Sequence, residues 1–351
     1  MTRRIHAGSS GANVMAFEER VRALQSIGLP PRQTEFLVTV ALHGGYCLQR
    51  QYDAFTGRAH GQIACDFFER LVSWQLATRV HFARHRGAIY HLHAKALYRA
   101  IGQADNRNRR SASSAHIARK LMVLDYVLAT RSRHWLATEH DKVALFTTRF
   151  GVATIDLPQR RYTSGHDRDP STCRYFVHKL PVAVVDAEGS VELVYLVLDD
   201  SGAGFETFLT DHLRLLSRLD AWTIVAVCPP NIDGLAARRR VFARTFPAAT
   251  SGPSAPTNRE ELRWFFRVRD SIERNDVRHL SVPDLNRFRE LRQRLPPASI
   301  ERLYASWQRL GDAVLATEER DRLVLRAPRE RLVEYPLPFR YEQFGSWPGL
   351  A

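Results

Sequence analysis

The feature that most constrains the fold is a change in hydrophobic period within the first hundred residues. Three segments carry apolar side chains every three or four positions, as amphipathic helices do: residues 31–45, 48–55 and 60–75. Two shorter segments then show the pattern of strands around a glycine-containing turn: residues 77–82 and 88–93. Three helices followed by a two-stranded hairpin are typical of a winged helix-turn-helix, which a helix over 94–101 would close.

The last helix of this unit has two distinct faces. Its predicted apolar stripe, packed on the earlier helices, consists of Ile63, Phe67, Leu71 and Trp74. The opposite face is polar, and the start of a recognition helix contacts base edges in the major groove. The predicted DNA-binding residues are Arg58, His60 and Gln62 at this helix and Arg79, Arg84, His85 and Arg86 on the hairpin. Asp66 and Glu69 would repel phosphate, so a protein-docking module stays open.

The charge of the chain favours an anionic partner, and its placement matters more than its total. The 351 residues contain 51 Lys+Arg and 37 Asp+Glu, a formal charge of +14. Only four of the 51 cations are lysines, so part of the excess is a general preference for arginine. Residues 1–112 hold 16 cations and 7 acids, which concentrates the excess around the predicted winged helix.

The remaining patterns predict a multidomain α+β protein. Helical segments begin near His116 and after the cap residue Thr138. Strand-like segments follow, with a helix between the second and third: residues 176–186, 192–199 and 221–229. The predicted parts are a flexible arm (1–15), a winged helix-turn-helix (16–101), a linker (102–114), an α/β domain with a small central sheet (115–245) and a helical C-terminal region with an edge hairpin (258–351).

Three carboxylates stand at the ends of the predicted strands. Asp186 ends one strand, and Asp199 and Asp200 end the next. Carboxylates placed in this way can hold Mg²⁺ for phosphodiester hydrolysis, which makes a metal-dependent nuclease an alternative function. No lysine follows Asp199, and the Ser201–Gly204 segment lacks the Gly-Lys-Ser/Thr ending of a phosphate loop. The other interpretation is that these residues only terminate strands.

Cysteine and histidine spacing predicts no cofactor and no metal site. The four cysteines are scattered without paired spacing, which favours a reducing cytoplasm over a disulfide framework or a zinc motif. His91 and His93 share a strand face, but no third ligand is nearby in the sequence. No apolar run is long enough to span a membrane, and no secretory signal is expected at the N-terminus.

Two segments carry a family resemblance. PPRQTEFLVTVALHGG leads into the winged helix, and HIARKLMVLDYVLA precedes the small sheet domain. This order, over roughly residues 20–230, resembles the replication-relaxation proteins of bacterial plasmids and integrative elements, which implies a role in replication or mobilisation. Their second domain is similar to a restriction-endonuclease-like fold. Here Pro181-Val182 replaces the Pro-Asp of that fold, and Val197-Leu198-Asp199 replaces its acid-x-Lys element.

Both departures remove metal ligands or the lysine, so we expect a non-enzymatic protein. The expected function is binding of double-stranded DNA in the replication, mobilisation or transcriptional regulation of a mobile element. The C-terminal helices are the expected site for a protein partner, and a homodimer is a further expectation. A metal-dependent DNA nuclease and a protein-interaction adaptor remain the alternatives.

Overall fold

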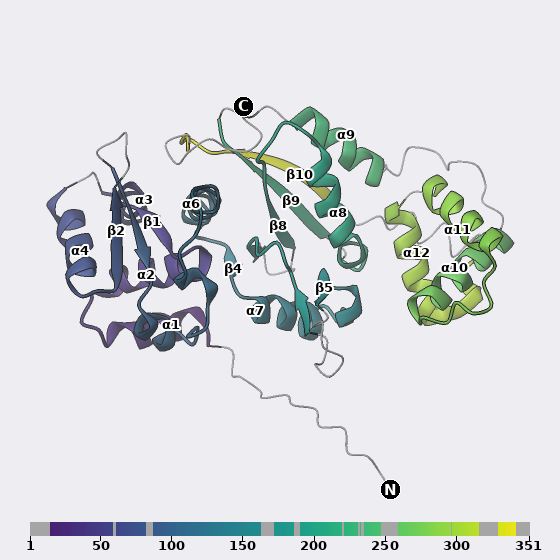
Figure 1. Ribbon diagram of the computed structural model, residues 1–351, viewed down its shortest axis with the longest axis horizontal. Coiled ribbons are helices and arrows are strands. Elements are labelled where there is room, and N and C mark those ends of the chain that lie inside the picture. The colour runs from purple at the N-terminus through teal and green to yellow at the C-terminus, as the bar shows by residue number, and fades with distance from the viewer. Residues whose placement is uncertain are drawn as a thin grey trace, which may run out of the picture. The chain divides into compact units, whose positions relative to one another are not determined.

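The computed structural model describes residues 15–58, 61–81, 87–162, 172–185, 190–219, 221–230, 232, 235–246, 259–295, 297–315 and 329–341. The chain divides after Ala129 into two compact units, which we call unit 1 and unit 2. Both units combine helices with small sheets (Figure 1), so the fold is mixed α+β, as the sequence predicts.

Unit 1 has the order of elements expected of a winged helix. Its helices are α1 (Phe17–Gln25), α2 (Pro31–His43), α3 (Gln49–Thr56), α4 (Gln62–Ser73), α5 (Lys95–Ala100) and α6 (Ser114–Ala129). Its strands are β1 (Tyr46–Leu48), β2 (Ala77–His81) and β3 (Ala88–Leu92), in the order β1-β3-β2 with antiparallel neighbours. The predicted hairpin is confirmed as β2 and β3. The short strand β1 was not predicted.

Local backbone chemistry sets the ends of these elements. Pro31 is the first residue of α2, a position where the missing N–H of proline is not needed. Gly57 ends α3 with a φ of 66°, in the left-handed region that favours glycine. Gly45, also left-handed, lies so close to Asn108 that a Cβ at residue 45 would sit 2.5 Å from the Asn108 carbonyl oxygen.

The buried face of α4 differs from the predicted stripe. Phe67 and Leu71 are fully buried as predicted, but Ile63 is 56% exposed and Trp74 is 45% exposed. The face that enters the core consists of Ala64, Phe67, Phe68 and Leu71. These four positions recur every three or four residues and therefore lie on one side of the helix. Ile63 lies at the margin of this buried face. Trp74 follows the last helical residue, where its ring lies 5.8 Å from the Arg70 guanidinium.

Residues 102–114 are part of unit 1 and not the predicted linker. The Asn108 side chain donates to the Ala41 carbonyl at 3.0 Å, and the Asn108 carbonyl pairs with His91 Nε2 at 3.0 Å. A 3₁₀ turn at Arg107–Arg109 lies within this segment. The polar composition that suggested a linker therefore reflects hydrogen bonds to the winged helix.

Helix α6 also belongs to unit 1, so the boundary lies later than predicted. Arg50 on α3 makes a bidentate ion pair with Asp125 on α6, at 2.6 and 2.8 Å. The neighbouring Gln51 side chain donates to the Leu121 carbonyl at 3.0 Å. By this division the predicted 115–245 domain loses its first helix to the winged helix.

Unit 2 is built on a mixed five-stranded sheet. Its helices are α7 (Glu139–Ala144), α8 (Ala203–Leu216), α9 (Leu235–Thr245), α10 (Arg259–Glu273), α11 (Val282–Arg294) and α12 (Pro297–Leu310). Its strands are β4 (His134–Leu136), β5 (Gln159–Tyr162), β6 (Thr172–Tyr175), β7 (Val182–Val184), β8 (Val191–Leu196), β9 (Ala221–Cys228) and β10 (Arg329–Pro336). The sheet order is β10-β9-β8-β7-β4, with β8, β9 and β10 parallel and β7 antiparallel to both neighbours. The predicted succession of strand, strand, helix and strand is confirmed as β7, β8, α8 and β9.

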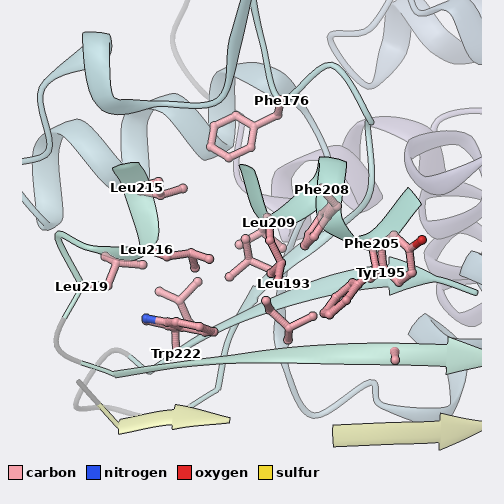
Figure 2. Packing of buried hydrophobic residues seen from close by; sticks show 14 of the residues in the cluster. Phe176, Leu193, Tyr195, Phe205, Phe208, Leu209, Leu215, Leu216, Leu219 and Trp222 are labelled. Atoms are coloured by element: carbon pink, nitrogen blue, oxygen red, sulfur yellow. The ribbon is translucent and has the colours of Figure 1, made fainter. Parts of the chain in front are cut away.

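Helix α8 covers one face of this sheet and forms the main core of unit 2. Alternate residues of β8 and β9, including Tyr195 and Trp222, point to the same side. Figure 2 shows these side chains meeting Phe205, Phe208 and other apolar residues of α8. The core position of α8 fixes the loop that joins β8 to the helix, where Asp199 and Asp200 lie.

The C-terminal part of unit 2 contains a helical segment and one edge strand. Strand β10 is the edge strand of the five-stranded sheet and pairs in parallel with β9 along all eight residues, while the first strand of the predicted edge hairpin cannot be compared with the structure. Residues 316–328 lie outside the described residues. Helices α10–α12 form their own apolar cluster, in which Phe265 and Phe266 are buried. An ion pair of 2.5 Å joins Arg214 on α8 to Glu273 on α10.

Two further features concern the pairing of the cysteines and the length of the apolar helices. Cys47, Cys65, Cys173 and Cys228 lie on four different elements, and none of them forms a disulfide bond. In the part of the chain that the structure describes, none of the helices combines the length and the apolar character needed to cross a bilayer.

Candidate nucleic-acid interface

Helix α4 presents a polar outer face on unit 1. The exposed residues along the middle of this face are Gln62, Asp66, Glu69 and Ser73. Gln62 Nε2 donates to Asp66 Oδ1 at 2.6 Å within the helix. Gln62 would have to give up this hydrogen bond to pair with a base, at a net cost of about 1 kcal/mol.

Arg58 lies on a fixed backbone just before α4. Its N–H donates to the Asp53 carbonyl at 3.2 Å across the left-handed turn at Gly57, and its side chain is exposed. The turn therefore directs the chain from α3 toward α4 with a cationic side chain at the surface. The Arg58 guanidinium is available for phosphate or for a guanine edge.

Arg79 occupies an equally fixed position on β2. The residue pairs in register with Tyr90 on β3, and its side chain is exposed. The Tyr90 ring stacks on Phe68 of α4, with 4.1 Å between ring centroids. Burial raises the pKa of Tyr90, and the charge of Arg79 opposes that shift. Strand β2 is thus connected to α4 through its partner strand β3.

Four predicted contacts cannot be placed in the same way. His60, Arg84, His85 and Arg86 lie outside the described residues. Their contribution to DNA binding stays a prediction from the sequence. Of the predicted set, the structure places Arg58, Gln62 and Arg79 on or next to the elements of the helix-turn-helix and hairpin.

The surface of α4 and β2 is not uniformly cationic. Asp66 and Glu69 lie at the centre of the outer face of α4, where a groove-binding helix meets negative potential. Ile63, Val72 and Val80 are exposed by 56%, 36% and 51%. A surface on which carboxylates lie beside exposed apolar side chains is better suited to binding another protein than to binding the phosphate backbone of DNA.

Of the three carboxylates considered for a nuclease, Asp199 is held by neighbouring protein groups. Asp199 Oδ1 accepts a hydrogen bond from Ser201 Oγ at 2.8 Å and lies 3.6 Å from the fully buried Arg238 guanidinium. Arg238 also donates to the Asp199 carbonyl. Asp200 is exposed, and Asp186 lies outside the described residues. Over the described ranges no three His, Cys, Asp or Glu side chains are grouped to hold a metal ion.

His91 on β3 has a packing role. His91 is buried and stacks on Tyr46, with ring centroids 4.1 Å apart and planes 4° apart. Burial lowers the pKa of His91, which favours the neutral ring. Lys120 lies 5.0 Å from the other partner of this stack, the Tyr46 ring. The structure therefore uses His91 to anchor β3 against β1 and the Asn108 segment.

Sequence reasoning missed a polar cluster in unit 2. Lys142 on α7 is fully buried, donates to the Leu180 carbonyl at 2.6 Å, and has a pKa that burial lowers to about 8. His178 pairs with Asp211 at 2.9 Å, and the ring of the buried His212 lies 5.9 Å from that of His178. Lys142 is one of only four lysines in an arginine-rich chain, and that rarity was the available signal.

The two-stranded sheet next to this cluster was missed as well. Strands β5 and β6 pair antiparallel and place Arg160 opposite Arg174. The short segments Gln159–Tyr162 and Thr172–Tyr175 contain too few apolar residues to show a strand pattern. Tyrosine, threonine and cysteine at their ends were the only indication of strand propensity.

Comparisons with protein-family models, with curated proteins and with solved structures found no match to this chain.

Proposed function

We propose that the chain binds duplex DNA through the winged helix of unit 1. Helix α4 would enter the major groove, with Gln62 at its start and Arg58 immediately before it. Arg79 on β2 would contact the sugar-phosphate backbone, as would Arg84, His85 and Arg86 at the predicted wing. In this proposal the protein acts in replication, mobilisation or transcriptional regulation of a mobile element.

One observation carries the proposal. The elements α2, β1, α3, α4, β2 and β3 follow one another in winged-helix order, with the sheet order β1-β3-β2. The third helix of this arrangement keeps its N-terminal outer face exposed, and exposed arginines lie just before it and on the strand after it. Helix-turn-helix proteins use that helix and that strand pair to contact DNA.

The test compares two double variants that remove the same charge from unit 1. The variant Arg58→Gln/Arg79→Gln removes the two proposed phosphate contacts whose residues lie in the described part of the chain. In Arg99→Gln/Arg107→Gln two exposed arginines outside the helix-turn-helix are lost. Binding of a labelled genomic duplex library is measured by fluorescence anisotropy over a series of salt concentrations.

The first variant should weaken binding and make the slope of log K against log[salt] shallower by about 1.8, because two phosphate contacts are removed. The control should leave the slope near the wild-type value. Equal slopes for the two variants would contradict the proposed interface. Circular dichroism spectra of both variants verify that each is folded.

A second candidate function is favoured by the acidic centre of α4. In a protein-docking module, Asp66 and Glu69 would pair with cations of a partner protein, beside the exposed Ile63 and Val72. The variant Asp66→Asn/Glu69→Gln separates the two functions in the same anisotropy assay. Tighter DNA binding is expected if α4 faces phosphate, because two like charges are removed. Unchanged DNA binding favours the docking module.

A further inference from the structure

The hairpin of β5 and β6 breaks a local rule of sheet stability. Its register places Arg160 directly opposite Arg174, and the two side chains are 56% and 57% exposed. Like charges that face each other across antiparallel strands destabilise the pair. Violations of this kind are expected where a surface is used for binding rather than for folding.

Acidic neighbours compensate these two charges only loosely. Arg160 Nη2 lies 3.9 Å from Asp211 Oδ2, and Arg174 Nη1 lies 4.0 Å from Glu139 Oε2. Both distances exceed those of a charge-assisted hydrogen bond. Each carboxylate also has a closer partner: Asp211 Oδ2 pairs with His178 at 2.9 Å, and Glu139 Oε1 accepts the Tyr175 N–H at 2.8 Å.

His178 completes this surface from a turn of unusual backbone geometry. The turn contains Phe176 and Lys179, which are not glycine but have φ angles of 48° and 55°. Non-glycine residues in this region carry strain and are found at ligand-binding sites. The bond from His178 Nε2 to Asp211 fixes the orientation of the imidazole ring, which is 33% exposed. A ring held in this way presents Nδ1 in one direction.

We propose that Arg160, Arg174 and His178 form a binding site for a phosphate ester on unit 2. A phosphate between the two guanidinium groups would replace their repulsion by two charge-assisted contacts. Arginine suits this role because its planar fork can bind two oxygens of one phosphate. With both ring nitrogens protonated, His178 would keep its Nε2 bond to Asp211 and donate a third hydrogen bond to the phosphate from Nδ1. The ligand is either a phosphodiester of a nucleic acid strand or the phosphate of a small molecule, and the shared chemistry is the phosphate group.

The closest competing explanation is that arginine is abundant on every surface of this chain. A matched control addresses it. Arg239 and Arg240 on α9 are exposed, and neither side chain has a hydrogen-bond or ion-pair partner in the described part of the chain. The variant Arg239→Gln/Arg240→Gln therefore removes two positive charges from unit 2 without touching the proposed site.

The experiment uses the full chain and has two arms. In the first, wild type, Arg160→Gln/Arg174→Gln and the α9 control are titrated with a labelled duplex and a labelled single strand over a salt series. Loss of two phosphate contacts should make the salt slope shallower by about 1.8 for the duplex or about 1.4 for the single strand. In the second arm, inorganic phosphate is titrated while the His178 ring resonance, assigned with His178→Gln, is followed by NMR.

The results separate the two ligand sources. A slope change in the Arg160/Arg174 variant, absent from the α9 control, supports a nucleic acid site. A phosphate-dependent shift of the His178 resonance, lost in the same variant, with unchanged slopes supports a small phosphate ester. The proposal is overturned if the variant matches the control in both arms. The variant should also melt at the wild-type temperature or above, since a purely structural role of the arginines predicts a lower one.

This test is independent of the winged helix. If Arg58→Gln/Arg79→Gln has no effect on DNA binding, the function proposed for unit 1 fails. A loss confined to the Arg160/Arg174 variant would then still locate phosphate binding on unit 2. Conversely, normal binding by the Arg160/Arg174 variant leaves the interface on α4 and β2 untouched.

Discussion

Two ionisable side chains in unit 2 are buried next to the ring of Phe176. Lys142 Nζ lies 5.7 Å from the centroid of this ring, and the His212 ring lies 6.4 Å from it. Each has a carbonyl partner, Leu180 for Lys142 and Phe208 for His212. Burial lowers the pKa of Lys142 to about 8 and that of His212 to about 4, so folding makes protonation of both side chains less favourable than in the unfolded chain.

The buried His212 should make stability depend on pH. Its ordinary pKa of 6.5 applies to the unfolded chain, and desolvation lowers the folded value to about 4. Between these values the unfolded state binds more protons, so the free energy of unfolding decreases as the pH falls from 6.5 to 4. The loss attributable to His212 should reach about 3 kcal/mol. The neighbouring Lys142 and His178 lower the pKa further, and Asp211 opposes them.

The measurement is urea denaturation of wild type and His212→Leu at several pH values from 7 to 4. The variant should lose less stability than wild type over this range by about 3 kcal/mol. His140→Leu, which changes an exposed histidine on α7, should keep the wild-type dependence. An equally steep dependence in His212→Leu would refute the assignment to this residue.

For single residues, the sequence predicts burial well only where the type of side chain and its position in the helical repeat both favour the core. Phe67 and Leu71 are buried as predicted, because large apolar side chains at helical spacing seek the core. Ile63 has the same character but lies at the margin of the face, and periodicity could not locate that margin. The burial of Lys142 depends on Phe176 and Leu180, which are distant in sequence. No local pattern could indicate it.

At the scale of elements, one ion pair holds helix α3 against α6. Arg50 and Asp125 make two hydrogen bonds of 2.6 and 2.8 Å, and the Asp125 side chain is only 7% exposed. Gln51, one residue along, links α3 to the α6 backbone. This contact fixes the position of the helix that precedes Arg58 and α4.

Breaking this pair should destabilise unit 1. Asp125→Ala leaves Arg50 beside a partly desolvated surface without its carboxylate, and the free energy of unfolding should fall by about 3 kcal/mol. Arg50→Ala/Asp125→Ala should be more stable than the sum of the single effects predicts, because no unpaired charge remains. Chemical denaturation of the four proteins in the cycle gives the coupling energy. Strictly additive effects would show that the pair does not join the two helices.

Elements are easier to predict from the sequence when the residues that pair in them are close together along the chain. The hairpin of β2 and β3 is local, and the turn around Gly87 with its flanking strands identified it. Strands β5 and β6 are charged on their exposed positions and were missed. Strand β10 was recognised as extended, but its parallel partner β9 lies before the whole α10–α12 segment. Register between distant strands is not encoded in either strand alone.

At the scale of the whole molecule, the boundary between the units could not be predicted from composition. Residues 102–114 are polar and carry a basic run, which predicted a linker. The Asn108 side chain and carbonyl instead bind Ala41 and His91. The predicted recognition helix and hairpin are present as α4, β2 and β3, so the sequence predicts the elements of the candidate site. It does not predict all of the side chains that these elements expose. The acidic centre of the site was visible, but its exposed apolar flank was not.

Strand β10 should be required for the integrity of unit 2. A chain that ends after Leu315 lacks β10, so the β9 edge exposes unpaired backbone groups beside the apolar Val225 and Val227. This chain should aggregate, whereas a chain that ends after Tyr341 retains β10 and should stay dispersed. Size-exclusion chromatography with light scattering distinguishes the two. A monomeric Leu315-terminated chain with the wild-type melting temperature would disprove a role for the edge strand.

The late position of β10 also has a consequence during protein synthesis. Strands β8 and β9 leave the ribosome before α10–α12, and β10 follows only after residues 259–315 have been translated. At about 5–20 residues per second, β9 waits on the order of ten seconds for its neighbour. During this interval the nascent chain carries an open sheet edge that other nascent chains or a chaperone can occupy. The helical segment between β9 and β10 thereby sets the time during which the growing chain needs protection.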